Sequence, residues 1–434
     1  MKYSNLVFEG GGVKGIAYVG VLEAITKIPL KNNGEPIDLI KDIKRVAGTS
    51  AGAITALLVS LNYSVEEIKK ELSEIDFNKF ADKPTLRDQL INLPDRLCKG
   101  EHYIYEGSEI LSWVHSVIEK KLRKPTVTFK ELKDLGYKEL YIIGTNITKR
   151  AVEIFSPEHT PDMPVDIAVR ASMAIPFVFK GIRFSINNKV YDPNGKDLYV
   201  DGGIISNYPI EIFDNKKYII DKEYLKLTEY GSIPNLSTPS RYECFALTTV
   251  HDLQEPIGLY RFINAETLGF KVDSKDEIDR YSIKIQADIN KEEIEDNLRQ
   301  KIVSLFGSLL WAHAESVAII SSLASIYNNS ENIIRGKTES LRTVYIDSKE
   351  IPTTDFSLTE KDKKALIDSG YSAWAIFKET YLYAVAEWKK HKNNKELLFQ
   401  SSTPPFPSTH TSNSNNSPED KPTRSDSRPF SPVP

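Results

Sequence analysis

The chain has 434 residues, of which 40% are hydrophobic and 27% charged, as in an ordinary globular protein. Its net charge of −4 gives no chain-wide basic field, so we expect no nucleic-acid partner. Its two cysteines, Cys98 and Cys244, form neither a CxxC motif nor a zinc-ligand pair, and we expect no dependence on disulfides.

No part of the sequence has the pattern of a targeting or membrane-spanning segment. Residues 1–15 lack a basic region followed by an apolar stretch and a small-residue cleavage site. The longest apolar run, residues 53–61, is far shorter than the roughly 20 residues that span a bilayer. We therefore expect a protein that is cytoplasmic, or secreted without a cleaved signal peptide, and whose membrane contact is peripheral.

The first 60 residues twice repeat the order strand, glycine-rich turn, helix. An apolar run at 6–8 leads into three glycines and a helix over 16–28, and a run at 46–47 leads into a second turn and a buried helix over 53–61. This alternation predicts an α/β fold.

Further along the chain, short apolar runs predict strands and longer periodic segments predict helices. We expect strands at 141–144, 153–155, 198–200 and 344–346, and helices over most of 65–124 and over 167–174, 292–327 and 360–391. Residues 210–245 have mixed character and are interpreted as an excursion or lid. From Ser401 onward Ser, Thr, Pro and Asn dominate, which predicts a disordered tail.

The first glycine turn, Gly10-Gly11-Gly12-Val13-Lys14-Gly15, fits the pattern GxGxxG. A dinucleotide-binding turn would need an acidic residue about 20 positions on, at the end of a second strand. Residues 31–38 are instead polar and turn-like. The alternatives are a plain structural turn and an oxyanion hole, in which glycine amides approach a developing alkoxide closely. We favour the oxyanion hole, formed by Gly10, Gly11, Gly12, Lys14 and Gly15.

The second turn, Gly48-Thr49-Ser50-Ala51-Gly52, has the GxSxG pattern of a nucleophile elbow between a strand and a helix. The turn is too tight for side chains on both flanks, so Gly48 and Gly52 leave Ser50 at its crest. The alternative is a structural serine that caps the helix. The strand and helix on either side favour Ser50 as a nucleophile.

A serine nucleophile needs a base. Seven histidines are candidates, but none lies at a strand end or beside glycines: His102, His115, His159, His251, His313, His391 and His410. Asp201 is the better candidate, because it ends a strand and is followed by Gly202 and Gly203. In a dry site its pKa can rise enough to accept a proton. The alternative is a turn-initiating Asp-Gly-Gly without a catalytic role.

In this order the three motifs resemble those of the patatin-like phospholipase family, of bacterial type. Three more blocks extend the resemblance: residues 170–179 before the aspartate, residues 201–209 with the spacing DGG-x-x-x-N-x-P, and residues 355–371 at the closing helix. The resemblance covers residues 4–380 and is weakest over 210–340.

The resemblance implies a three-layer α/β/α sandwich with a mostly parallel central sheet. It implies a Ser50–Asp201 dyad without histidine, an oxyanion held near Gly11 and Gly12, and an acyl-serine intermediate that needs no metal and no cofactor. It also implies that the protein hydrolyses acyl esters, and the expected substrate is a phospholipid or another lipid ester. We expect a catalytic domain over residues 1–395 and a disordered tail over 396–434.

Two other functions stay open on the sequence alone. The acyl-enzyme could transfer its acyl group to an alcohol instead of water, which would make the protein a lipid transacylase. A patatin scaffold could also serve as a lipid-binding or partner-binding protein. Either function is compatible with a protein activator. The composition of the polar tail is compatible with the secretion signal of a bacterial effector.

Overall fold

The computed structural model describes residues 3–32, 35–36, 38–75, 103–220, 229–232, 260–262, 264–276, 278, 342–353 and 355–393. The chain divides into one unit of Met1–Lys392 and a second of Asn393–Pro434. The predicted helix over 292–327, most of the predicted lid over 210–245 and the predicted disordered tail lie outside the described residues.

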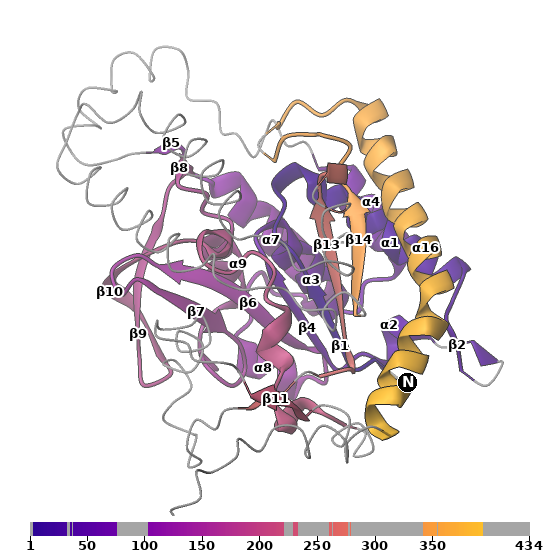
Figure 1. Ribbon diagram of the computed structural model, residues 1–434. Helices are drawn as coiled ribbons and strands as arrows, with labels where there is room; N and C mark the ends of the chain where they lie inside the picture. The colour runs from indigo at the N-terminus through magenta and orange to yellow at the C-terminus, as the bar shows by residue number, and fades with distance from the viewer. Residues whose placement is uncertain are drawn as a thin grey trace, which may run out of the picture. The chain divides into compact units, whose positions relative to one another are not determined.

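A mixed sheet forms the centre of the first unit (Figure 1). Five neighbouring strands are parallel, in the order β14, β13, β1, β4 and β6, and the antiparallel strands β10, β9 and β7 complete the β6 side. Their bounds are Thr343–Asp347 for β14, Thr267–Asp273 for β13, Asn5–Phe8 for β1, Arg45–Thr49 for β4, Glu139–Asn146 for β6, Val190–Asp201 for β10, Ile182–Asn187 for β9 and Ala151–Phe155 for β7.

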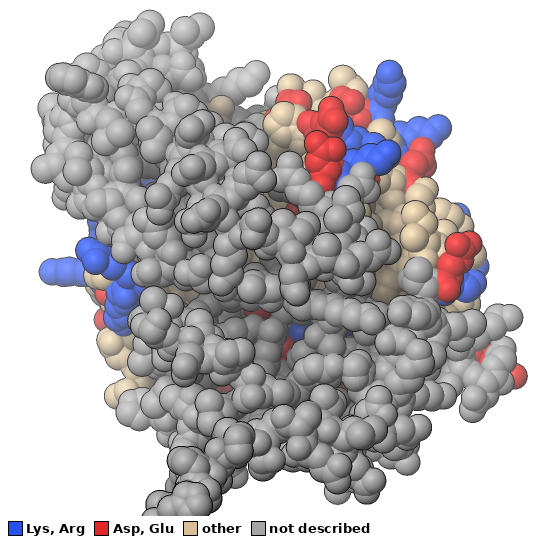
Figure 2. Space-filling view, viewed as in Figure 1, with Lys and Arg blue, Asp and Glu red and all other residues tan. Residues whose placement is uncertain are grey.

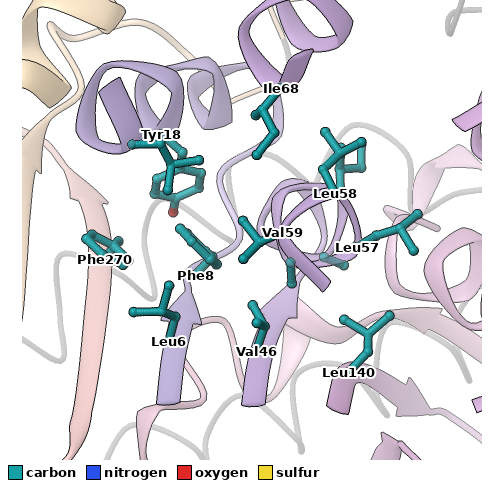
Figure 3. Packing of buried hydrophobic residues seen from close by; sticks show 14 of the residues in the cluster. Leu6, Phe8, Tyr18, Val46, Leu57, Leu58, Val59, Ile68, Leu140 and Phe270 are labelled. Atoms are coloured by element: carbon teal, nitrogen blue, oxygen red, sulfur yellow. The ribbon is translucent and has the colours of Figure 1, made fainter. Parts of the chain in front are cut away.

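One face of the sheet is covered by helices. Because side chains alternate along a strand, Leu6 and Phe8 of β1 point to this face and Val7 to the other. Figure 3 shows Leu6, Phe8, Val46 and other strand residues packed under helical side chains. The helices are α1 (Ala17–Lys27), α3 (Ala51–Ser60), α4 (Val65–Ser73), α7 (Ser108–Leu122), α9 (Val165–Ser172) and α16 (Glu360–Asn393).

The opposite face is covered by the segment that follows β10. Ile205, Tyr208 and Phe213 pack there against β-strand residues such as Val7 and Ala47. This segment contains the short 3-10 helices η2 (Gly202–Ile204), η3 (Ile210–Phe213) and η4 (Lys216–Tyr218). The sheet is therefore covered on both faces, and the predicted three-layer α/β architecture with a mostly parallel sheet is confirmed.

Most expected elements are present with wider bounds. The strands predicted at 6–8, 46–47, 141–144, 153–155 and 344–346 are β1, β4, β6, β7 and β14. The region 65–124, expected to be mostly helical, contains α4 and α7 but also the short strand β5 (Tyr103–Tyr105), which pairs with β8 (Phe177–Phe179). The smaller elements are η1 (Gly12–Ile16), α2 (Leu39–Asp42), α8 (Phe129–Asp134) and the pairs β2 (Lys31–Asn32) with β3 (Glu35–Pro36) and β11 (Glu229–Ser232) with β12 (Tyr260–Phe262).

Two features of the sheet were not predicted. Strand β13 occupies the position between β1 and β14 although its sequence includes Lys271 and Asp273. Strand β10 starts at Val190, eight residues before the predicted strand, and forms a hairpin with β9. Asn188 and Lys189 form its two-residue turn with φ of 51° and 69°, as a tight hairpin requires.

The described surface carries both signs of charge. Figure 2 shows Lys and Arg side chains beside Asp and Glu side chains near the start of α16. Pairs such as Lys363–Glu360 and Lys349–Asp347 account for part of this mixture. Among the residues that the structure describes, no helix is long and apolar enough to cross a membrane.

Helices α1 and α16 approach each other through two glycines. A Cβ on Gly20 would lie 1.8 Å from the Ile367 carbonyl oxygen, and a Cβ on Gly370 would lie 2.0 Å from that of Ala17. Each glycine thus makes room for the other helix. Trp374 reinforces the contact by donating a hydrogen bond from Nε1 to the Ile28 carbonyl.

We predict that Gly370→Val lowers the free energy of unfolding by about 1–3 kcal/mol, because the new side chain forces α16 away from α1. Urea-induced unfolding measures the change. Ile376→Val on the same helix is the control, since Ile376 is 64% exposed, and its effect should stay within about 0.5 kcal/mol. Equal losses in the two variants would contradict the close approach of the helices.

Candidate functional site

Ser50 lies between the end of β4 and the start of α3, in the position expected for a nucleophile elbow. Its φ of 51° and ψ of −123° are strained for a residue with a Cβ. The two flanking glycines are required by contact: a Cβ on Gly48 would lie 2.1 Å from the Gly52 carbonyl oxygen, and one on Gly52 would lie 2.4 Å from that of Phe8. The turn therefore has no room for side chains at Gly48 and Gly52, as predicted.

Two buried hydrogen bonds hold this strained turn in place. The Ser50 amide donates to Ser172 Oγ at 2.9 Å, and Thr49 Oγ1 donates to the Ser206 carbonyl at 2.9 Å. Ser172 comes from the end of α9, and Ser206 from the loop after Asp201. The turn is thus tied to both segments that surround it, while the Ser50 hydroxyl is not used for capping.

Asp201 ends β10 and lies two strands away from Ser50. It pairs with Gly144 of β6, and on the other side of β6 Thr49 pairs with Ile143. Ser50 follows Thr49, so Ser50 and Asp201 stand at the same level of the sheet with β6 between them. Gly202 then passes directly over the Ile143 carbonyl, where a Cβ would lie 2.3 Å from its oxygen.

The Asp201 carboxylate is buried and only partly hydrogen-bonded. Oδ1 accepts a hydrogen bond from the Gly203 amide at 2.7 Å, whereas Oδ2 is buried and has no partner at ordinary hydrogen-bond geometry among the described residues. Burial raises the pKa of Asp201 to about 6, although the Ser50 hydroxyl and the Gly203 amide act in the opposite direction. A proton acceptor with a pKa near neutrality therefore lies beside the serine.

The glycine loop lies on the other side of Ser50 and leads into η1. The Gly10 amide donates to the Asn207 carbonyl at 2.9 Å, and the Lys14 amide donates to the Gly11 carbonyl at 3.2 Å. The Gly11 and Gly12 amides donate to no acceptor in the described part of the chain. The five residues predicted as an oxyanion hole thus include two with amides available to a ligand.

Two further features fix the shape of this loop. Gly12 has a φ of +55°, and a Cβ there would lie 2.1 Å from the Thr353 carbonyl oxygen, so the position requires glycine. Gly15 faces Ala51 at the start of α3. The loop and the elbow are thus packed directly against each other.

An apolar pocket of about 550 Å³, a volume that includes open solvent, has Ser50 in its lining. Apart from Ser50 and Thr55, the side chains that line it are apolar. They come from the glycine loop and from several helices and loops, and the lining comprises Gly12, Val13, Gly15, Ile16, Ser50, Ala51, Ile54, Thr55, Leu72, Ile75, Ile110, Met173, Ile175, Phe179 and Phe356.

The two histidines whose side chains the structure describes have other partners. His115 Nε2 lies 2.9 Å from Asp166 Oδ2, and His159 Nδ1 lies 2.7 Å from Ser156 Oγ. Neither hydrogen-bonds to Ser50. The described residues contain no group of three or more His, Cys, Asp or Glu side chains that could hold a metal ion.

Sequence reasoning assigned no role to Ser172, Asn207 or Phe356. All three lie in the blocks 170–179, 201–209 and 355–371 that carried the family resemblance. Ser172 holds the elbow, Asn207 holds the glycine loop and Phe356 lines the pocket. Their place in those blocks was the available signal, but only the tertiary contacts show what each side chain touches.

Comparison with known proteins places these features in a family. A model of the patatin-like phospholipase family matches residues 6–214, which include the glycine loop, Ser50 and Asp201. An uncharacterized protein of Acanthamoeba polyphaga mimivirus is 30% identical over 49% of this chain and 62% of its own length. The uncharacterized protein YqhO of Bacillus subtilis is 30% identical over 50% of this chain and 68% of its own length.

A third relative has a name that states an activity. The "Probable lipid hydrolase 463L" of Invertebrate iridescent virus 6 is 31% identical over 50% of this chain and 66% of its own length. The chain thus covers about two thirds of each of these relatives, and each match spans about half of the chain. On these matches and the site geometry, the chain belongs to the patatin-like phospholipase family.

Proposed function

We propose that this protein is a lipid acyl hydrolase of the phospholipase A or lysophospholipase type, with Ser50 as nucleophile and Asp201 as general base. The observation that carries the proposal is the placement of Ser50. It lies on a strained elbow, beside a buried carboxylate with a raised pKa, in the lining of an apolar pocket. Family membership and a relative named as a lipid hydrolase support the same reaction class.

In the first half of the reaction, the ionised Asp201 carboxylate takes the proton of the Ser50 hydroxyl. Oγ attacks the ester carbonyl carbon, and the electron pair of the carbonyl moves to its oxygen. When the tetrahedral intermediate collapses, the bond to the leaving alcohol breaks and Asp201 returns its proton to that alcohol. Acyl-Ser50 remains, and Asp201 is ready to accept a proton from water in the second half.

The Gly11 and Gly12 amides are the proposed donors to the oxyanion. Both are without an intramolecular acceptor in the described residues, and both belong to the loop that lies against the elbow. Backbone amides that are already in position need no reorganisation when the charge develops. Loss of one such donor in a serine hydrolase costs about 10²–10³ in rate, and we expect a contribution of this size from each amide.

The pocket supports a fatty acyl chain as the group that Ser50 receives. An alkyl chain gains about 0.8 kcal/mol for each methylene that it buries, and the pocket wall offers it only two polar side chains. A lipid that reaches this pocket from a bilayer requires peripheral membrane contact. Water or another alcohol can accept the acyl group, so transacylation shares every step up to acyl-Ser50.

We predict that Ser50→Ala and Asp201→Asn each lower ester turnover by at least about 10³-fold. The first variant removes the nucleophile, and the second leaves it without a base. Release of fatty acid from a mixed lipid extract, followed by mass spectrometry, measures the loss. Ser60→Ala and Asp197→Asn are matched controls, because they change a buried serine of α3 and an aspartate of β10 outside the proposed dyad. Full activity of Asp201→Asn would exclude the dyad.

We predict that kcat/KM rises with pH through a midpoint at about 6 and then levels off, because Asp201 accepts a proton only when it is ionised. Burial raises this pKa, so protonation of Asp201 favours the folded state. Activity lost below pH 6 through this group should thus be lost without unfolding. Kinetics across pH 4–8 measure the loss of activity, and tryptophan fluorescence over the same range measures unfolding. A midpoint near the ordinary aspartate value of about 4 would contradict the assignment.

We predict that Ile110→Phe shifts the preference of the enzyme toward shorter acyl chains, because Ile110 lines the pocket and the larger ring occupies part of it. The ratio of kcat/KM for a C16 ester to that for a C4 ester should fall roughly tenfold or more. Ile118→Phe is the matched control: Ile118 is equally buried on α7 but does not line the pocket. An unchanged ratio in Ile110→Phe would show that the acyl chain lies elsewhere.

A further inference from the structure

A series of buried polar side chains connects strand β13 to the glycine loop. Lys271 of β13 forms salt bridges with Glu9 (Nζ to Oε1, 3.2 Å) and with Asp273. The side chains of Lys271 and Glu9 are each only 4% exposed. A charged pair buried this deeply on a sheet face would be costly unless each member has partners.

Glu9 carries the connection from β13 to the loop. It directly precedes Gly10, and its Oε2 accepts a hydrogen bond from the Val272 amide at 2.8 Å. Its own amide donates to the Phe270 carbonyl at 3.0 Å. Strand β13 therefore holds both the backbone and the carboxylate of Glu9, the residue directly before the glycine loop.

Asn207 completes the connection. Its Nδ2 donates to Glu9 Oε1 at 3.3 Å and to the Gly10 carbonyl at 2.9 Å, and its own carbonyl accepts from the Gly10 amide at 2.9 Å. Because Glu9 Oε1 also faces Lys271, the cation and the Asn207 amide group contact the same carboxylate oxygen. The Gly10 peptide is thereby held on both sides.

The glycine loop needs such support from its neighbours. Gly10, Gly11 and Gly12 have no side chains with which to fix their own orientation, and glycine has the greatest backbone freedom of any residue. An oxyanion hole acts only when its amides are held close to their productive geometry. The orientation of the loop must therefore come from side chains outside it.

We propose that Lys271, Glu9 and Asn207 are positioning residues that hold the Gly11 and Gly12 amides in the orientation required to receive an oxyanion. Lys271 holds the Glu9 carboxylate in place, Glu9 orients the Asn207 amide group, and Asn207 holds the Gly10 peptide. The inference rests on the proposed hydrolase function for its catalytic meaning. Its structural content, that Lys271 immobilises the glycine loop, can be tested separately.

Two single variants and their combination test the series in the full chain. Lys271→Met removes the cation that faces the buried Glu9 carboxylate, and Glu9→Gln removes the carboxylate charge that faces Lys271. The double variant Glu9→Gln/Lys271→Met removes both charges of the Lys271–Glu9 pair, and replacement of a whole buried pair is far better tolerated than loss of one member. Asp273 loses its salt bridge to Lys271 in Lys271→Met and in the double variant alike, so the comparison of these two isolates the contribution of Glu9. We expect Lys271→Met to lower kcat roughly 10–100-fold with KM within about threefold, and the double variant to recover at least about fivefold of that loss.

Arg342→Met is the matched control for general destabilisation. Arg342 is a fully buried cation of the same sheet region, and its hydrogen bonds to Asp214 (2.6 Å) and to the Asn264 carbonyl do not involve the glycine loop. This variant should lower the urea midpoint as much as Lys271→Met does, while kcat per folded molecule stays within about twofold of wild type. A comparable fall of kcat in Arg342→Met would show that any buried charge has this effect and would overturn the proposal.

Hydrogen exchange of the Gly10 amide gives a readout that does not depend on turnover. This amide donates to Asn207, so loosening of this contact should speed its exchange roughly tenfold or more in Lys271→Met and not in Arg342→Met. If wild type releases no fatty acid, the proposed function fails while the exchange experiment still decides whether Lys271 holds the loop. Unchanged exchange of the Gly10 amide in Lys271→Met would overturn the inference in either case.

Discussion

The Gly10 amide donates a hydrogen bond to the Asn207 carbonyl, and the Asn207 side chain donates one back to the Gly10 carbonyl. These two bonds join the loop after β1 to the loop after β10, which almost 200 residues separate in the sequence. The first loop contains the amides proposed for the oxyanion, and the second begins with Asp201. Since Thr49 is bonded to Ser206 in that same second loop, Ser50, Asp201 and the amides of the glycine loop are all fixed relative to one another through residues 201–207.

The fold followed from the sequence wherever a local signal was sufficient. The strands β1 and β4 contain short apolar runs and lead into glycine-rich turns, and the helices after them are long enough to be recognised from their apolar residues. Strand β13 was missed because Lys271 and Asp273 make it look polar, although all seven of its residues are buried. Their burial depends on Glu9, which is about 260 positions away. The sequence around β13 gives no indication of that pairing, so β13 is recognised as a buried strand only in the structure, where it lies beside β1.

The same distinction applies to the site. The pattern GxSxG contains its own physical reason, because the turn excludes side chains at Gly48 and Gly52, and Ser50 could be placed from sequence alone. Asp201 could be placed because it ends a strand and two glycines follow it. Ser172 and Asn207 are ordinary polar residues in their own segments, and their contacts with Ser50 and Gly10 come from the way α9 and the loop after β10 pack on the elbow. The residues proposed for chemistry were thus accessible from sequence, and the residues that position them were not.

An aspartate base changes what the site must do electrostatically. With a neutral histidine as base, proton transfer from serine creates a positive imidazolium next to the new oxyanion. With Asp201, the negative charge that begins on the carboxylate ends on the oxyanion, so a single charge moves from one loop to the other. Burial disfavours that charge on Asp201, as its raised pKa shows, and hydrogen bonds from the Gly11 and Gly12 amides would favour it at its destination. The gain from this transfer depends on the distance and orientation between the two loops, which is why the contact between Gly10 and Asn207 matters for the proposed chemistry as well as for the fold.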